Sequence, residues 1–415
     1  MSSPLQLETR PYGQISPSER LHLFAFSVAS GIHTAKTFAS YIFSSERKNK
    51  TWKRFQGEAG GRYTTERLNI PELQSRRPST YASYTQFIQE TGLESNVEIL
   101  ESPAPKSDNV GHSTTFMNAK LLWVGRKRHD RVILYIHGGG YVMAMNKASL
   151  YFWDYMQKEL ETHGFSTGIA VLNYTIYPDG PFPTVLSEVT LAVNHLLSSG
   201  VDPRNLYIAG DSAGGNAVMQ LISHILHPGI VKSIPSAPIW APFAGAILIS
   251  PWVVLTTDSP SYAENESVDA VSRDGLERWG AAVLQQASDE YSSFVEPGKA
   301  PEGWFSGVES ILGRLFITAG DKECMRDDIS ALAGTLQEHY AMHHNKKMSV
   351  PVMKDEEFPH GNRNVTFMLE KGGVHDHSLV DFEVGETRLV ETTRILIDWL
   401  AGGMNPSIEV QGKEH

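Results

Sequence analysis

From about residue 97 onward, the chain alternates short apolar runs with amphipathic stretches. Six runs have the length and apolar character of buried strands, at residues 132–136, 170–174, 206–209, 246–250, 315–319 and 365–369. Stretches with helical periodicity lie between and after them, at about 146–162, 184–198, 215–226, 269–287, 326–340 and 388–401. This order predicts an α/β protein with a mostly parallel central sheet that is flanked by helices on both faces.

Two regions interrupt the alternation. Residues 1–95 contain no strand pattern, and residues 253–308 separate two of the expected strands with polar and aromatic sequence. Insertions in α/β enzymes usually lie at the carboxyl ends of the strands, where ligands bind. We therefore expect a core of residues 96–252 and 309–405, an N-terminal helical cap region at 1–95 and a cap insertion at 253–308, with both cap segments forming a lid.

The N-terminal region contains one clear amphipathic helix, at residues 21–43. Its apolar residues recur at steps of three and four, which is the period of one helix face. They are Leu21, Phe24, Val28, Ile32, Ala35, Ala39 and Ile42. Ser16, Pro17 and Glu19 supply an N-cap, a first-turn proline and a capping-box partner. Two alternatives are open for this helix: packing on the body or over the pocket, and a peripheral contact with a membrane.

Composition limits the partners and the compartment. The 415 residues carry a formal net charge of −11. An acidic chain is poorly suited to nucleic acid, because phosphate backbones are bound by clustered lysine and arginine. The single cysteine, Cys324, excludes an internal disulfide, and the N-terminal residues lack the pattern of a secretory signal. We expect a cytoplasmic protein, and the oligomeric state is left open.

A nucleophile motif follows the third expected strand. Gly210-Asp211-Ser212-Ala213-Gly214 comes directly after the run at 206–209 and precedes an apolar helix. This strand–turn–helix context is the one that a G-x-S-x-G nucleophile elbow requires. The turn presents the serine hydroxyl at a helix N-terminus, where the helix dipole favours developing negative charge. Ser212 is therefore the predicted nucleophile.

A glycine-rich turn follows the first expected strand, with the sequence His137-Gly138-Gly139-Gly140-Tyr141. Glycines allow backbone amides to point toward one position without a side chain in the way. Such preorganised donors stabilise the oxyanion of acyl transfer. We expect the donors among Gly138, Gly139 and Gly140, with Gly139 as first choice, together with the amide of Ala213.

The combination of HGGGY with GDSAGG resembles the hormone-sensitive-lipase branch of the α/β-hydrolases. That branch includes bacterial esterases, arylacetamide deacetylase and fungal steryl acetyl hydrolases. Residues 173–183 are similar to its tyrosine–proline–phenylalanine–proline segment, and Ser250-Pro251-Trp252 resembles its S-P-W strand end. The resemblance covers about residues 97–400. It implies the α/β-hydrolase fold and a triad in the chain order serine, acid, histidine.

The resemblance also locates the base. The family places it on the loop after the last strand, where His375-Asp376-His377 follows the run at 365–369. We assign His375, with His377 as the alternative. His360 precedes that strand and belongs to the wrong end of the sheet. No further cluster with zinc-like spacing accompanies these histidines, so we expect no metal.

The acid should follow the strand at 315–319. Aligning Met325-Arg326-Asp327-Asp328 on the family's L-R-D-[ED] places Glu323 where the family usually has its catalytic aspartate. This is a departure in residue type, although either carboxylate can orient an imidazole. Asp321 is nearer the strand end and is the alternative. Cys324 is given no role.

Together these residues predict a carboxylic-ester hydrolase that works through an acyl-enzyme without a cofactor. Aromatic residues in both cap regions suit a small hydrophobic ester, such as a short acyl group on a bulky alcohol or a lipid-like ester. The same triad serves acyl transfer, lactone opening and condensation in secondary metabolism, and these reactions are alternatives. A non-catalytic small-molecule receptor on this fold is a third possibility, but receptors of this type lack the histidine that His375 supplies.

Overall fold

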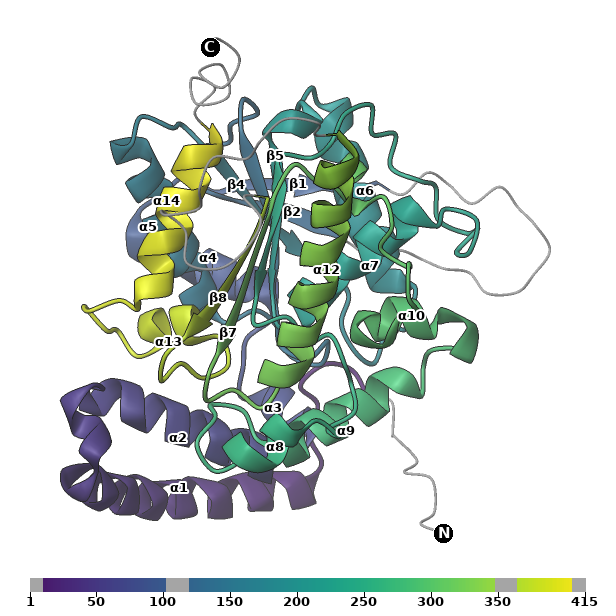
Figure 1. Cartoon of the computed structure of the whole chain (residues 1–415). Coiled ribbons are helices and arrows are strands. Elements are labelled where there is room, and N and C mark those ends of the chain that lie inside the picture. Colours follow the sequence, from purple (N-terminus) through teal and green to yellow (C-terminus); the bar gives the residue numbers. More distant parts are fainter. Residues whose placement is uncertain (1–9, 102–118, 348–363, 405–415) are drawn as a thin grey trace.

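The structure is a computed structural model that describes residues 10–101, 119–347 and 364–404. An eight-stranded sheet lies at its centre, with helices on both faces and more helices beyond one end of the strands (Figure 1). The strand order is β1-β2-β4-β3-β5-β6-β7-β8. The predicted α/β class, with a mostly parallel sheet, is confirmed.

The sheet is parallel except at one edge. Its strands are β1 (Asn96–Ile99), β2 (Lys120–Val124), β3 (Val132–Ile136), β4 (Gly168–Asn173), β5 (Leu206–Asp211), β6 (Gly245–Ile249), β7 (Leu315–Gly320) and β8 (Val365–Glu370). β2 runs antiparallel to both of its neighbours, whereas all pairs among β3 to β8 are parallel. The six predicted strands are β3 to β8. The sequence pattern missed the two antiparallel strands.

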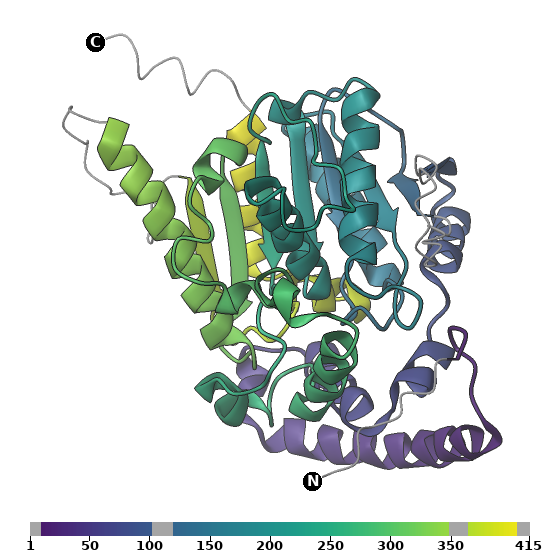
Figure 2. The same cartoon turned by 90° about the vertical axis from the view of Figure 1, so that its right-hand side faces the viewer.

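Helices cover the two faces of the sheet (Figures 1 and 2). One face carries α4 (Thr80–Thr91), α5 (Lys147–Thr162), α13 (His377–Glu383) and α14 (Glu391–Met404). The other face carries α6 (Thr184–Ser198), α7 (Ala213–Leu226), α10 (Ser292–Val295), α11 (Val308–Ile311) and α12 (Arg326–Lys347). Short 3₁₀ turns are η1 (Ser45–Lys48), η2 (Pro203–Asn205), η3 (Asp289–Tyr291) and η4 (Pro297–Lys299).

Each central strand contributes to two apolar layers, because successive side chains point to opposite faces. In β3, Leu134 and Ile136 belong to the cluster that includes residues of α6, α7 and α12. Ile133 and Tyr135 belong to the second cluster, which includes residues of α5 and α14. Burial on both faces explains why these strands read as continuous apolar runs.

The cap is built from two segments that are far apart in the sequence. The N-terminal segment supplies α1 (Pro17–Phe43), α2 (Trp52–Arg67) and α3 (Ile70–Ser75), and the insertion supplies α8 (Pro260–Asn265) and α9 (Arg273–Leu284). These helices lie beyond the carboxyl ends of the strands (Figures 1 and 2). Thr65 on α2 joins the segments, since its Oγ1 accepts from the amide of Ser272 at 2.9 Å. In contrast, α4 packs on α5, at the side of the core.

The start of α1 is as predicted. Ser16 Oγ accepts from the Glu19 amide at 3.2 Å, and Glu19 Oε2 accepts from the Ser16 amide at 2.6 Å. The helix packs on α2 through its other face, where Phe26 stacks on Tyr63. The apolar stripe itself points outward, and Leu21 is 70% exposed. The helix itself packs on α2, as one of the two alternatives expects, whereas its apolar stripe is left exposed.

None of the described helices combines the length and the apolar character that a membrane-spanning segment needs.

Candidate active site

Ser212 occupies the sharp turn between β5 and α7. Its backbone has φ 49° and ψ −119°, a conformation that costs energy for a residue with a side chain and that recurs at functional sites. The flanking glycines are required by close packing. A Cβ at Gly210 would lie 2.4 Å from the oxygen of Gly214, and one at Gly214 would lie 2.0 Å from the oxygen of Ile136. The G-x-S-x-G spacing is thus a steric necessity of this turn.

His137 stabilises the glycine turn after β3 through hydrogen bonds. The ring is buried, and burial lowers its pKa to about 4, so the imidazole is neutral. Its Nδ1 donates to the carbonyl of Gly138 at 2.7 Å, which leaves Nε2 to accept from Thr80 Oγ1 at 3.1 Å. Tyr174 donates to the His137 carbonyl at 2.7 Å. The histidine of the motif therefore positions the backbone and does not reach the reacting atoms.

Three glycines were expected to supply oxyanion donors, and the structure shows that their amides differ in hydrogen bonding. The Gly138 amide donates to Asp211 Oδ1 at 2.8 Å, so it is engaged and does not fit the expected role. Gly139 and Gly140 have φ values of 108° and 62° and line the same pocket as Ser212. Within the described residues, their amides donate no hydrogen bond. This leaves Gly139 and Gly140, together with Ala213 at the first position of α7, as the candidate donors.

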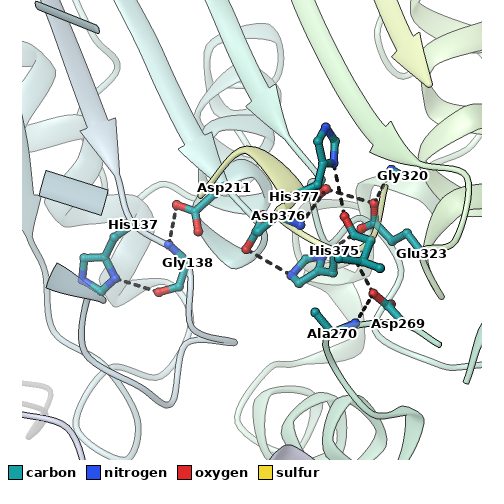
Figure 3. Close-up of polar contacts among 12 residues, drawn as sticks. His137, Gly138, Asp211, Asp269, Ala270, Gly320, Glu323, His375, Asp376 and His377 are labelled. Carbon is teal, nitrogen blue, oxygen red and sulfur yellow. Dashed lines mark hydrogen bonds and ion pairs between the residues drawn. The ribbon is translucent and has the colours of Figure 1, made fainter. Parts of the chain in front are cut away.

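Glu323 and His375 are brought together by the loops after β7 and β8 (Figure 3). His375 Nδ1 lies 2.8 Å from Glu323 Oε1. The second carboxylate oxygen of Glu323 accepts from Ser250 Oγ and from the Gly320 amide, both at 2.9 Å. Glu323 is fully buried, so these contacts fix its orientation. The carboxylate thereby sets the tautomer of the imidazole, with Nδ1 protonated and Nε2 directed away.

Asp321 and His377, the alternatives for the acid and the base, make other contacts. Asp321 Oδ1 accepts from the Gly372 amide at 2.6 Å and joins the two loops. The ring of His377 points away from His375, with Nδ1 3.2 Å from the Val374 carbonyl (Figure 3). Neither side chain contacts the Glu323–His375 pair.

Ser212 and His375 line one pocket of about 490 Å³. Their side chains are not hydrogen-bonded to each other. Instead, His375 Nε2 lies 3.3 Å from Asp376 Oδ2 (Figure 3). In structures without substrate, catalytic hydrogen bonds are often long or absent and form only in the complex. The candidate nucleophile, base and acid thus share one site, in which the candidate base is in contact with a second carboxyl group.

Asp376 is a residue that the motif analysis did not assign. It has a positive φ of 54°, its amide donates to Ser250 Oγ at 3.1 Å, and its Oδ1 is buried without a hydrogen-bond partner. Burial raises the pKa of its carboxyl well above the usual value; the charge of His375 opposes this rise, and repulsion by Asp211 and Glu323 adds to it. A carboxyl with these properties holds a proton readily. It can therefore share one proton with the imidazole.

The charge around His375 is dominated by carboxyl groups. Burial by itself lowers the pKa of the ring, but the charge of Asp376 and the hydrogen bond that the ring donates to Glu323 outweigh burial and raise this pKa to about 10. The imidazolium is therefore stabilised, which favours the proton transfer that a general base performs.

Asp269, from the cap insertion, ties the cap to the two triad loops. Its carboxylate accepts from the amides of His375 at 2.8 Å and Cys324 at 2.7 Å, each by a different oxygen. Arg62 on α2 donates to the Asp269 carbonyl at 2.6 Å. The buried side chain of Asp269 thus positions the backbone of His375 and of Cys324, and its backbone carbonyl joins the insertion to α2. Sequence reasoning missed it, because no motif surrounds it.

The pocket extends from Ser212 into the cap. Its cap wall is formed by glycines on one face of α2, at Gly57, Gly60 and Gly61, and it reaches Ser30 on α1. Trp279 and Val271 from the insertion line it as well. Gly57 and Gly61 are packed against Val384 and Ala270, whereas a Cβ at Gly60 would meet only Gln56 Nε2, at 3.6 Å, so the open part of this wall is at Gly60.

Comparison with known proteins identifies relatives of this arrangement. The family model described as "Steryl acetyl hydrolase" matches residues 73–358. An acetyl-hydrolase of Streptomyces hygroscopicus is 26% identical over 226 residues, which are 54% of this chain and 66% of the relative. Arylacetamide deacetylase of Oryctolagus cuniculus is 27% identical over 190 residues, covering 43% of this chain and 45% of the relative. These matches agree with the predicted resemblance.

A solved esterase of the bacterial hormone-sensitive lipase family has the same fold. It aligns with a TM-score of 0.57 and 18% identity, covering 85% of this chain and 97% of the esterase. The α/β-hydrolase fold is thereby confirmed. The matches to the curated relatives are shorter and span from about half to just under two thirds of the length of those two proteins.

Proposed function

Because the chain belongs to the steryl acetyl hydrolase family, we propose that it is a serine hydrolase that cleaves a carboxylic ester, with preference for an acetyl or other short acyl group on a bulky apolar alcohol. The observation that supports this proposal most is the set of groups that line one pocket. Ser212 on the nucleophile elbow, His375 and the free amides of Gly139 and Gly140 all line it. Glu323 holds the imidazole from outside the pocket.

The reaction would proceed in two halves. Ser212 Oγ attacks the ester carbonyl carbon while His375 Nε2 takes its proton. The carbonyl oxygen becomes negative and accepts from the amides of Gly139, Gly140 and Ala213. The tetrahedral intermediate then collapses, and His375 returns the proton to the leaving alcohol. Water attacks the acyl-enzyme by the same route and releases the carboxylic acid.

For this sequence to begin, His375 Nε2 must carry a lone pair and turn from Asp376 toward Ser212. The contact between Nε2 and Asp376 Oδ2 is favourable only while a proton lies between them. When the shared proton leaves, the two groups repel and the ring is released toward the pocket. Asp376 would therefore position the base through its own protonation.

The preference for a small acyl group and a large alcohol rests on the shape of the site. The elbow, the glycine turn and the His375 loop surround Ser212 closely, whereas the cap side is lined by the glycines of α2. A short acyl chain suits the crowded side. The roomier cap side suits a larger alcohol, to which Val271, Trp279 and Leu379 offer apolar contacts.

The proposal is tested with p-nitrophenyl esters from acetyl to decanoyl and with an acetyl ester of a bulky apolar alcohol. The native chain should hydrolyse the acetyl esters fastest, and Ser212→Ala should lose all but about 10⁻³ of the rate or less. Ser198→Ala, an exposed serine at the end of α6, is the matched control and should keep full activity. Equal rates in native chain and Ser212→Ala would refute the assignment. Product analysis separates hydrolysis from acyl transfer, lactone opening and condensation, because only hydrolysis releases a free acid and a free alcohol.

A further inference from the structure

Helix α1 turns an apolar stripe to solvent, while its inner face combines apolar residues such as Phe26 with polar ones. A surface helix normally turns its apolar stripe to the core and its polar face to solvent. On α1, polar residues face inward: Gln56 of α2 donates to Thr34 Oγ1 at 3.3 Å, His33 stacks on Tyr63, and Ser30 lines the pocket.

The outward face is apolar over the whole length of the helix. Leu21 and Phe24 are each 70% exposed, Val28 is 57% exposed and Ile32 is 56% exposed. Phe38, Ile42 and Phe43 continue the exposure to the end of the helix. We call this set the outer stripe: Leu21, Phe24, Val28, Ile32, Phe38, Ile42 and Phe43. A continuous apolar patch of this kind marks an interaction surface.

The position of α1 suits contact with a flat surface. The helix is straight over 27 residues and forms the outermost layer of the molecule, on the far side of α2 from the sheet (Figures 1 and 2). Its outer stripe therefore faces away from the protein, except that the ring of Phe38 also contacts Trp52 of α2. Nothing else in the described residues lies over that face in either view.

The charges at the edges of the outer stripe are positive. Arg20, Lys36, Arg47 and Lys48 are exposed on α1 and on η1, which follows it. The acidic residues of these two elements are Glu19, which is paired with Arg10, and Glu46, which lies 3.6 Å from Lys50. The helix thus carries cations on an otherwise acidic chain of net charge −11. Cations beside an apolar helix face are the pattern of a helix that lies in the interface of an anionic lipid layer.

From these observations we propose that α1 docks the protein on an anionic lipid surface, with the outer stripe in the headgroup and acyl boundary. A second copy of the chain is a poorer occupant. Pairing two outer stripes would bring Arg20 and Lys36 of both copies together, without an exposed carboxylate on α1 to balance them. Docking would also place the α1 side of the pocket, at Ser30, close to the lipid. An apolar ester could then enter the pocket from the lipid; this last step rests on the proposed function, whereas docking does not.

The test is flotation of the full chain with vesicles of phosphatidylcholine alone and of phosphatidylcholine with phosphatidylserine. The native chain should bind both, more tightly when phosphatidylserine is present and less tightly in high salt. The variant Val28→Glu/Ile32→Glu should lose at least about tenfold in binding to both vesicles, because two exposed apolar side chains that would enter the lipid become charges. Lys36→Glu should lose only the preference for the anionic vesicles.

Matched controls separate docking from folding and from catalysis. Ile99→Glu replaces an equally exposed apolar residue, 64% exposed on β1 at the sheet edge, and should bind vesicles like the native chain. Val28→Glu/Ile32→Glu should keep the native rate on water-dissolved p-nitrophenyl acetate, and should hydrolyse an ester dissolved in vesicles at least about fivefold more slowly. Binding is measured without turnover, so it is informative even if the esterase proposal fails.

Two results would overturn the docking proposal. One is native chain that does not float with either vesicle, or Val28→Glu/Ile32→Glu that floats equally well. The other is a stable dimer in lipid-free buffer that Val28→Glu/Ile32→Glu, but not Ile99→Glu, converts to monomer, since a second copy would then occupy the outer stripe.

Discussion

Glu323 Oε1 lies 2.8 Å from Nδ1 of His375, which joins the loop after β7 to the loop after β8. The glutamate is fully buried, and its other oxygen is occupied by Ser250 and Gly320. An aspartate is one methylene shorter. The longer side chain of a glutamate spans the distance between these two loops, which explains why Glu323 is compatible with the family's arrangement.

The first prediction concerns this acid. Glu323→Ala should lower kcat/KM about 10³- to 10⁴-fold, because the imidazole loses both its orientation and the partner of its positive charge. Asp321→Ala should cost about 1 kcal/mol of stability through the lost bond to Gly372 and should keep activity within about tenfold. Steady-state kinetics and thermal unfolding of both variants check this. The reverse ranking of activities would assign the acid to Asp321.

The second prediction concerns pH. The base must be unprotonated, and the pKa of His375 is raised to about 10, so kcat/KM should rise with pH through a midpoint above the usual histidine range. Asp376→Asn removes a negative charge that stabilises the imidazolium. The midpoint should therefore move to lower pH, by about one unit or more.

The pH profile is measured between pH 5 and pH 10 on a soluble acetyl ester. Asp274→Asn, an exposed acid on α9, is the control and should leave the midpoint in place. An unchanged or higher midpoint in Asp376→Asn would mean that Asp376 does not act on the base.

The third prediction concerns the glycine wall of α2. A Cβ at Gly60 would meet only Gln56 Nε2, at 3.6 Å, whereas a Cβ at Gly57 would lie 2.3 Å from Val384 Cγ1. Gly60→Ala should therefore stabilise the helix by about 0.5–1 kcal/mol, and Gly57→Ala should destabilise the fold by about 1–3 kcal/mol. Thermal unfolding of the two variants gives this comparison.

A larger side chain at the same position tests the role of the wall. Gly60→Phe should reduce kcat/KM for esters of bulky alcohols at least about tenfold more than for p-nitrophenyl acetate. An equal effect on both substrates would show that the bulky group does not lie against α2.

The parts of the site that are local in sequence were predictable. Ser212 and its glycines form one continuous turn, and the packing that requires Gly210 and Gly214 is encoded in their spacing. The six parallel strands were predictable for a similar reason, since burial on both faces produces apolar runs. β1 is short and only partly buried, so it leaves no such run.

The contacts that depend on distant segments were not predictable. Asp269 reaches His375 and Cys324 from the cap insertion, and Asp211 takes the Gly138 amide out of the donor set. Periodicity likewise predicted the helix at residues 21–43 but not its orientation. Which face of a helix is covered depends on what the rest of the chain places beside it, and Phe26 and Thr37 are buried while Phe24 and Val28 are not.

The central claim is that Ser212 is the nucleophile, and intact-mass spectrometry after treatment with a fluorophosphonate tests it most directly. The native chain should gain a single adduct that peptide mapping places on Ser212, and Ser212→Ala should gain none. An adduct on Ser212→Ala, or one that maps to another residue of the native chain, would contradict the account.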